Sequence, residues 1–376
     1  MTLGPSLGWP MNVPVLSDGV VTLRAYTPAD IDALLEMAQD PEMVRWTAVP
    51  SPHTRAMSEE FAFHLTPRGW NDGTARHWAI EHTGADGVPR FAGNLEIRGK
   101  GKVTDIGYGL HPAARGQGVM VRAVRLAVDW AVTHDDVEVV HWASHVGNVA
   151  SLRVAHACGF ELTGTRPGGL HERGRVLDAW TAVLRFGDAP TPRTRWLEPP
   201  VLETERVRLR PFHDDDVERV AQACSDPESR HWLNGLPHPY TTVTARGYLD
   251  DTVWRAAAGL KLTWAVADPA TDLLLGNLAV MDLAGLNPTT GEIGYWMHPQ
   301  GRGRGLMQEA VRLAIPYAFS PDGLDLRRLS LLAAQGNAAS NRIAEKVGFA
   351  QVGVERQAEL LGDGSVDDLV CYDLLR

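Results

Sequence analysis

The fold of this chain is decided by two short stretches, Arg115-Gly116-Gln117-Gly118-Val119-Met120 and Arg302-Gly303-Arg304-Gly305-Leu306-Met307. Each follows a segment predicted to be a strand and precedes a segment predicted to be an amphipathic helix. The glycines allow the backbone to bend tightly and to approach a ligand, and the free N–H groups at a helix start favour an anion. We therefore expect each turn to bind a diphosphate. Neither turn has the G-x-G-x-x-G spacing of a dinucleotide-binding fold or the Lys-Ser/Thr of a P-loop, which disfavours NAD and ATP.

The two turns belong to a repeat that covers most of the 376 residues. Both halves carry the same motifs in the same order: Leu-Arg, Asp-Pro-Glu followed by Trp, Trp-Ala, Ile-Gly-Tyr, His-Pro, the glycine turn, Asn-x-x-Ser and Gly-Phe. A repeat of this length predicts two domains, each with its own core. We expect an N-terminal domain over residues 1–186, a C-terminal domain over 201–376, and a semi-rigid, proline-rich linker over 187–200.

The composition is that of a globular protein, with 44% apolar residues, 22% charged residues and a formal net charge of -10. The acidic balance argues against a nucleic-acid partner, because phosphate contacts require clusters of Lys and Arg. The apolar stretches are too short to cross a bilayer and the first residues do not resemble a secretory signal, so we expect a cytoplasmic protein with no membrane partner. The cysteines and histidines show no metal-ligand spacing, and we expect no metal.

Strand-like and helix-like segments alternate in both halves. Alternating apolar residues predict strands over 21–24, 77–80, 91–97 and 137–144 in the first half and over 207–210, 262–267, 273–281 and 327–334 in the second. After each glycine turn, the apolar positions of a long helix lie on one face. This order predicts an α/β fold with a mixed sheet in each half, of the α+β kind.

The order of strand, His-Pro, Arg-Gly-x-Gly, amphipathic helix, strand, Asn-x-x-Ser and Gly-Phe resembles the GNAT superfamily of N-acetyltransferases. It is most similar to the ribosomal-protein N-terminal acetyltransferase branch, and the resemblance covers both halves almost completely. It implies two tandem acyl-CoA N-acyltransferase domains that use acetyl-CoA. In that family the glycine turn binds the coenzyme A pyrophosphate, which implies this role for Arg115 to Met120 and for Arg302 to Met307. The family prefers Gly or Ala where this chain has Met120 and Met307.

The resemblance also implies contacts with the pantetheine arm of coenzyme A. These fall by position on the strand residues Tyr108, Gly109 and Leu110 in the first half and Tyr295, Trp296 and Met297 in the second. It further implies that Asn148 and Asn337 contact pantetheine and that the hydroxyls of Ser151 and Ser340 donate to the coenzyme sulfur. The residues alone leave an alternative open, because Asn and Ser at a helix start are also favoured as N-caps.

Acetyl transfer to an amine needs a group that accepts the ammonium proton, since a protonated amine cannot attack. Glu292 and its counterpart Asp105 lie on the strand expected beside the acetyl group, where burial would raise the pKa of a carboxylate and make it a better base. The alternative is a solvated carboxylate, with water taking the proton. Because Trp296 is replaced by Gly109 in the first half, the C-terminal copy is closer to the family pattern and is our first candidate for activity.

Trp46 and Trp232 follow Asp-Pro-Glu at equal spacing. We expect them to line the acceptor cleft; core packing is the alternative, since it is the usual role of a tryptophan.

Together these residues predict an enzyme that transfers an acetyl group from acetyl-CoA to a primary amine by direct attack on the thioester. The acceptor stays open between the α-amine of a peptide or protein and a small-molecule amine, although an α-amine is more readily neutral near pH 7 than lysine. Two alternatives remain: one copy, for instance the N-terminal one, is silent and serves as a CoA-binding or scaffold module, or the whole chain is a non-enzymatic CoA sensor. A monomer or a homodimer is expected.

Overall fold

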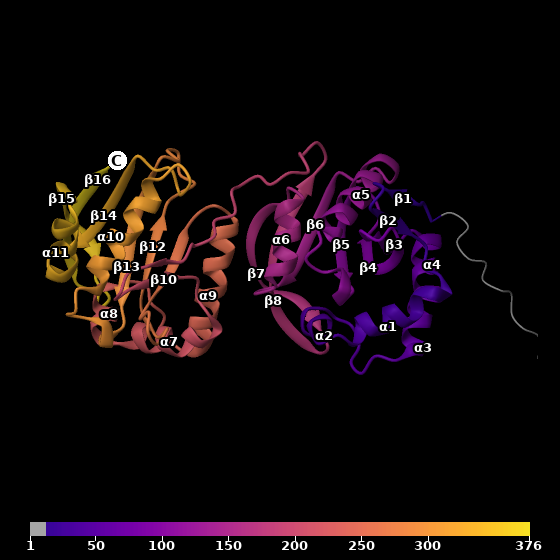
Figure 1. Cartoon of the computed structure of the whole chain (residues 1–376), viewed down its shortest axis with the longest axis horizontal. Coiled ribbons are helices and arrows are strands. Elements are labelled where there is room, and N and C mark those ends of the chain that lie inside the picture. Colours follow the sequence, from indigo (N-terminus) through magenta and orange to yellow (C-terminus); the bar gives the residue numbers. More distant parts are fainter. Residues whose placement is uncertain (1–12) are drawn as a thin grey trace, which may run out of the picture. The chain divides into compact units, whose positions relative to one another are not determined.

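The computed structural model describes residues 13–376, which divide into two compact units between Arg193 and Thr194 (Figure 1). The division lies inside the segment 187–200, which contains no helix or strand. The two ends of this segment pack on different units. Arg193 donates from Nε to the carbonyl oxygen of Gly159 at 2.8 Å in the first unit, whereas Leu197 is buried in the core of the second.

The first unit is built on one eight-stranded sheet. Its strands are β1 (Leu16–Ser17), β2 (Val21–Arg24), β3 (Ala75–Thr83), β4 (Pro89–Arg98), β5 (Val103–Leu110), β6 (Val139–His145), β7 (Glu161–Glu172) and β8 (Arg175–Arg185). Its helices are α1 (Ile31–Gln39), α2 (Pro41–Trp46), α3 (Arg55–Glu60), α4 (Thr66–Asp72), α5 (Val119–His134) and α6 (Val149–Ala157), with short helical turns η1 (Pro28–Asp30), η2 (Phe61–Leu65) and η3 (Pro112–Ala114). The strand order is β1-β2-β3-β4-β5-β6-β8-β7.

The second unit repeats this plan. Its strands are β9 (Leu202–Glu203), β10 (Arg208–Arg210), β11 (Leu262–Ala267), β12 (Leu274–Met281), β13 (Thr290–Met297), β14 (Arg328–Ala334), β15 (Ala350–Leu360) and β16 (Val366–Leu375). Its helices are α7 (Val217–Ser225), α8 (Pro227–Trp232), α9 (Thr242–Ala257), α10 (Leu306–Phe319) and α11 (Ala338–Val347), with short turns η4 (Asp214–Asp216) and η5 (Pro299–Gly301). The strand order, from one edge, is β9-β10-β11-β12-β13-β14-β16-β15.

Each sheet is mixed, because one central pair runs parallel and the described neighbours are otherwise antiparallel. The parallel pairs are β5 with β6 and β13 with β14, and each is connected by the long helix that follows the glycine turn. The predicted α/β fold with a mixed sheet is therefore confirmed in both units. Among residues 13–376, no helix combines the length and the apolar character needed to cross a membrane.

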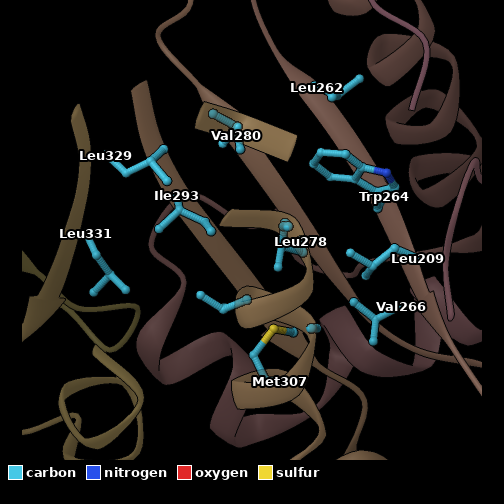
Figure 2. Packing of buried hydrophobic residues seen from close by; sticks show 14 of the residues in the cluster. Leu209, Leu262, Trp264, Val266, Leu278, Val280, Ile293, Met307, Leu329 and Leu331 are labelled. Carbon is cyan, nitrogen blue, oxygen red and sulfur yellow. The ribbon is translucent and has the colours of Figure 1, made fainter. Parts of the chain in front are cut away.

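The core of the second unit lies between its sheet and α10. Figure 2 shows Leu209, Trp264, Leu278 and Ile293 on the strands, in the same buried cluster as Met307 on the helix. Met307 is 4% exposed and Met120 of the first unit is 3% exposed. The methionine side chain that ends each glycine turn is therefore buried in the core beneath the helix and does not project toward a ligand. This explains why the chain tolerates a methionine where the family pattern has a small residue.

The Asp-Pro-Glu motifs begin α2 and α8. The side chains of Asp40 and Asp226 accept from the backbone N–H groups of Met43 and Ser229 at 3.0 and 3.1 Å, and proline occupies the first helical position. Asp40 and Asp226 are therefore N-caps. The proline that follows each lacks an N–H, but an N–H at the first helical position would have no partner within the helix.

Candidate active site

The glycine turns have the geometry of an anion site. Gly116, Gly118 and Gly305 have φ of 73° and Gly303 has φ of 71°, a left-handed conformation that glycine adopts without strain. A Cβ built on any of the four would meet no atom within 4 Å, so the surface above each turn is open. Among the described residues, the N–H groups of the three residues at each turn, 116–118 and 303–305, donate to no other group. Both turns therefore present free amides at the start of a long helix, the arrangement that binds phosphate.

The arginine that opens each turn has partners other than the expected pyrophosphate. Arg302 donates to Asp226 Oδ2 at 2.6 Å, to Ser229 Oγ at 2.8 Å and to Glu228 Oε2 at 2.8 Å. Arg115 donates to Asp40 Oδ2 at 2.5 Å. Each arginine thus fixes the N-terminus of the Asp-Pro-Glu helix against the end of the central strand, and a phosphate site at these turns depends on backbone amides. Arg304 is different, because its exposed side chain makes no ion pair within residues 13–376.

The central parallel strands separate next to these turns. β5 and β6 are paired only as far as Ile106 and Trp142, although β5 continues to Leu110. β13 and β14 are paired only as far as Glu292 and Ser330, although β13 continues to Met297. The unpaired edge contains the residues expected to meet pantetheine, namely Tyr108, Gly109, Leu110, Tyr295, Trp296 and Met297. The carbonyl oxygens of Leu110 and Met297 accept from Arg115 and Arg302, and the rest of this edge can pair with an extended amide-bearing arm, so the residues present fit coenzyme A.

The tyrosine of each Ile-Gly-Tyr motif contacts the serine of the Asn-x-x-Ser motif. Tyr295 Oη and Ser340 Oγ lie 2.9 Å apart, and Ser151 Oγ donates to Tyr108 Oη at 3.3 Å. In the first unit, Trp142 Nε1 also donates to Ser151 Oγ at 3.2 Å. Burial raises the pKa of both phenols, that of Tyr295 to about 12, so they remain protonated donors. Sequence reasoning placed the tyrosines beside pantetheine and missed this bond, because the partners are far apart in the chain.

Ser340 can therefore accept from Tyr295 and keep its own proton for a thiolate, whereas Ser151 accepts from Trp142 and donates its proton to Tyr108. The asparagines act as N-caps, since Asn148 and Asn337 Oδ1 each accept from the serine N–H at 3.1 Å. Their side-chain NH2 groups make no hydrogen bond among residues 13–376, which leaves these donors available to a ligand. The capping alternative and the ligand role are thus compatible.

The two candidate bases lie in different environments. Glu292 is half-buried, and burial raises the pKa of its carboxyl, as do the charges of Asp282 and Glu359. Glu359 itself has a raised pKa because of its burial and the charge of Asp367. Asp105 is exposed. A base with a raised pKa is better matched to an ammonium group, so the second unit has the stronger carboxylate base. The sequence did not predict that Glu359 lies near Glu292, because β15 carries no recognisable motif.

The side chains next to the end of the separated central strand differ between the two units. Trp296 packs against the apolar cluster of α7 and α9, and the α8 residue that matches Met43 in the repeat is the small Ser229. In the first unit a Cβ on Gly109 would lie 2.6 Å from Met43 Cε of α2. Met43 therefore occupies the space that the larger strand residue fills in the second unit, and the difference at Gly109 is compensated from α2.

Both tryptophans lie beside the end of the separated strand. The Trp46 ring is 6.0 Å from the ring of His145, the last residue of β6. A Cβ on Gly336, which precedes Asn337, would lie 3.6 Å from Trp232 Cη2. Neither tryptophan is buried, a position that is consistent with lining a cleft.

In each unit the last hairpin of the sheet contacts the segment that carries the tryptophan. Arg173, between β7 and β8, donates to the carbonyl oxygen of Thr47 at 2.9 Å, and Gly362, between β15 and β16, donates from its N–H to that of His231 at 2.9 Å. No sequence motif marks either contact.

Comparison with known proteins agrees with this geometry. The family described as "Acetyltransferase (GNAT) domain" matches residues 21–161 and 206–350. YdaF of Bacillus subtilis (strain 168) is 31% identical over 176 residues, which is 46% of this chain and 92% of that protein. The ribosomal-protein-serine acetyltransferase of Escherichia coli (strain K12) is 34% identical over 101 residues, 27% of this chain and 54% of that protein.

Among solved structures, RimJ of Mycobacterium smegmatis in complex with CoA-disulfide is 18% identical, with a TM-score of 0.43 over 47% of this chain and 88% of that chain.

Proposed function

The chain belongs to the GNAT acetyltransferase family, and on that premise we propose that each unit binds acetyl-CoA and that the C-terminal unit acetylates the α-amine of a peptide or protein. The observation that carries this proposal is the conjunction, in both units, of a turn with free amides and a strand edge left unpaired beside it. The turn would hold the pyrophosphate and the strand edge the pantetheine arm. Acetyl-CoA supplies an activated acetyl thioester, and the residues described here position and deprotonate its acceptor.

In the C-terminal unit, Glu292 would take the proton of the ammonium group, directly or through a water molecule. The free amine then attacks the thioester carbonyl, the carbon–sulfur bond breaks, and Ser340 donates toward the departing thiolate while Tyr295 donates to Ser340. The carboxylate of Glu359 lies near Glu292, and that of Asp367 lies near Glu359; neither has a basic partner within residues 13–376, so together they favour a cationic acceptor. Relatives named as acetyltransferases of ribosomal proteins support a peptide or protein amine. On composition we also propose a cytoplasmic location.

A silent N-terminal unit is the alternative, and the exposure of Asp105 favours it. A thiol-release assay with acetyl-CoA against a panel of N-terminal peptides and small amines tests both versions. We expect release with peptides, and in a chain that already carries Ser151→Ala this release should be abolished by Ser340→Ala. If Ser340→Ala leaves turnover unchanged while Ser151→Ala removes it, the assignment of activity to the C-terminal unit is wrong. If coenzyme A binds but no amine is acetylated, a sensor replaces the enzyme.

A further inference from the structure

The N-terminal unit contains a histidine–carboxylate pair that the mechanism above does not use. His145 Nε2 and Glu172 Oε2 lie 2.8 Å apart, and their side chains are 13% and 12% exposed. His145 ends β6 and Glu172 ends β7, so the pair joins two strands at one end of the sheet. Two polar side chains this well buried are costly to keep unless they are paired, and their partnership satisfies only one of the two imidazole nitrogens.

The position of His145 places it in the separated part of the sheet. β6 loses its pairing with β5 after Trp142, so His145 lies on the segment that borders the gap. Side chains alternate along a strand, so His145 shares a face with His141, whose register partner on β5 is Asp105. This is the face covered by α2, where Trp46 contacts the imidazole edge to face. The imidazole is therefore on the acceptor side of the gap, opposite the side on which Trp142 contacts Ser151.

The pair fixes which nitrogen can act as a base. Glu172 Oε2 accepts from Nε2, so the neutral ring carries its proton on Nε2 and has a lone pair on Nδ1. Nδ1 makes no hydrogen bond among residues 13–376 and is not sealed from solvent. An oriented imidazole with one free basic nitrogen is the arrangement used in general-base catalysis.

The C-terminal unit has no equivalent. β6 and β14 are both seven residues long and pair with β8 and β16 in the same way, which matches His145 with Ala334. The reverse holds for the carboxylates, because Glu292 is half-buried in the C-terminal unit whereas its counterpart Asp105 is exposed. Each unit thus has one partly buried basic group on the central parallel strands, and the two groups lie at different positions.

We propose that His145, oriented by Glu172, is the general base of the N-terminal unit, which is therefore an active acetyltransferase with its own acceptor. This inference rests on the proposed binding of acetyl-CoA by that unit. Nδ1 takes the ammonium proton of a primary amine, directly or through one water molecule. The amine lone pair then forms the new carbon–nitrogen bond and the carbon–sulfur bond breaks. The Ser151 hydroxyl gives its proton to the departing thiolate and takes up the second proton, which the new amide nitrogen loses. Glu172 holds the imidazole and stabilises the imidazolium.

The test uses the full chain with the C-terminal unit silenced by Glu292→Gln and Ser340→Ala, and an equimolar mixture of hexapeptides with free N-termini as acceptors. In this background, we expect His145→Gln to lower kcat by about 100-fold or more, the range of general-base catalysis. The calorimetric Kd for acetyl-CoA should change less than about twofold. Glu172→Gln should lower kcat less, and Glu172→Asp should restore part of it. The matched control is His141→Gln, which removes an exposed histidine from the same face of the same strand.

A second readout does not depend on turnover. Diethyl pyrocarbonate modifies neutral, accessible imidazoles, and mass spectrometry should find His145 modified in the free chain and protected by coenzyme A together with the peptides. Unchanged kcat in His145→Gln overturns the proposal, as does a His145 that the reagent never modifies. If the silenced chain binds acetyl-CoA at the N-terminal unit but shows no turnover, the base assignment is wrong and the binding proposal stands. If that unit does not bind acetyl-CoA, both fail.

Discussion

Replacing Arg302 by alanine separates a structural role of this arginine from a phosphate-binding role. In the structure Arg302 binds Asp226, Ser229 and Glu228, and its side chain is 25% exposed. Glu228 is 59% exposed, so its ion pair with Arg302 contributes little. The bonds to Asp226 and Ser229 remain. At about 1.5 kcal/mol each they contribute about 3 kcal/mol to stability.

For a unit of this size, a loss of about 3 kcal/mol lowers Tm by about 6–12 °C. We expect calorimetric unfolding of Arg302→Ala to show this shift in one transition, with the transition of the N-terminal unit unchanged. The Kd for acetyl-CoA should rise by less than about threefold, because the pyrophosphate would be held by backbone amides. Arg302→Lys is the control, since it keeps the charge but not the forked geometry.

The pH dependence of this difference has a definite sign. Partial burial raises the pKa of Asp226, but hydrogen bonds from Arg302 and the Ser229 backbone, with the charge of Arg302, outweigh it and lower the net pKa. The stabilisation is therefore present above the unfolded-state pKa and is lost as pH falls through the folded-state pKa. The gap in Tm between wild type and Arg302→Ala should narrow in acid. A more than tenfold loss of acetyl-CoA affinity with an unchanged Tm would refute this reasoning.

Substitutions at three further positions test the C-terminal unit. In a chain whose N-terminal unit is silenced by Ser151→Ala, Glu292→Gln should lower kcat at least about 100-fold. The same variant should raise Tm near pH 8. Burial and the charges of neighbouring carboxylates raise the pKa of Glu292, so ionising Glu292 in the folded unit lowers stability as pH rises through the folded-state pKa. A lower Tm for the variant contradicts this. Gly305→Asp should weaken acetyl-CoA binding more than tenfold by placing a carboxylate above the turn, whereas Gly305→Asn, which tolerates the same φ, should weaken it far less; equal effects in calorimetry would show that the turn does not face phosphate. Gly362→Ala should raise the KM for the acceptor but not the Kd for acetyl-CoA, because a Cβ there would overlap the carbonyl oxygen of Arg230 and open the hairpin contact; steady-state kinetics that show the opposite pattern reject this role.

The parts of the fold that depend on local pattern could be read from the sequence. The strand expected over 262–267 is β11, and the apolar face expected on the long helices contains Met307 and Ala310, which are buried in the core. The tight turns could also be predicted from their glycines, and all four glycines have a left-handed backbone.

The parts that depend on contacts between residues distant in the chain could not be predicted from the sequence. Arg302 and Asp226 both stand out in the repeat, but nothing local shows that they bind each other rather than a ligand. The same is true of Met43, which fills the space beside Gly109, and of His145, whose partner Glu172 lies on another strand. A repeat reveals which positions match, whereas the partners of a side chain are set by how the sheet brings its strands together.

The central claim is that each glycine turn binds its own molecule of acetyl-CoA. The most direct test is calorimetric titration of the full chain with acetyl-CoA. The account predicts two molecules bound per chain, with one site lost in Gly118→Asp, the other lost in Gly305→Asp, and none left in the double variant. Binding that survives in the double variant, or a wild-type chain that binds no acetyl-CoA, would contradict it.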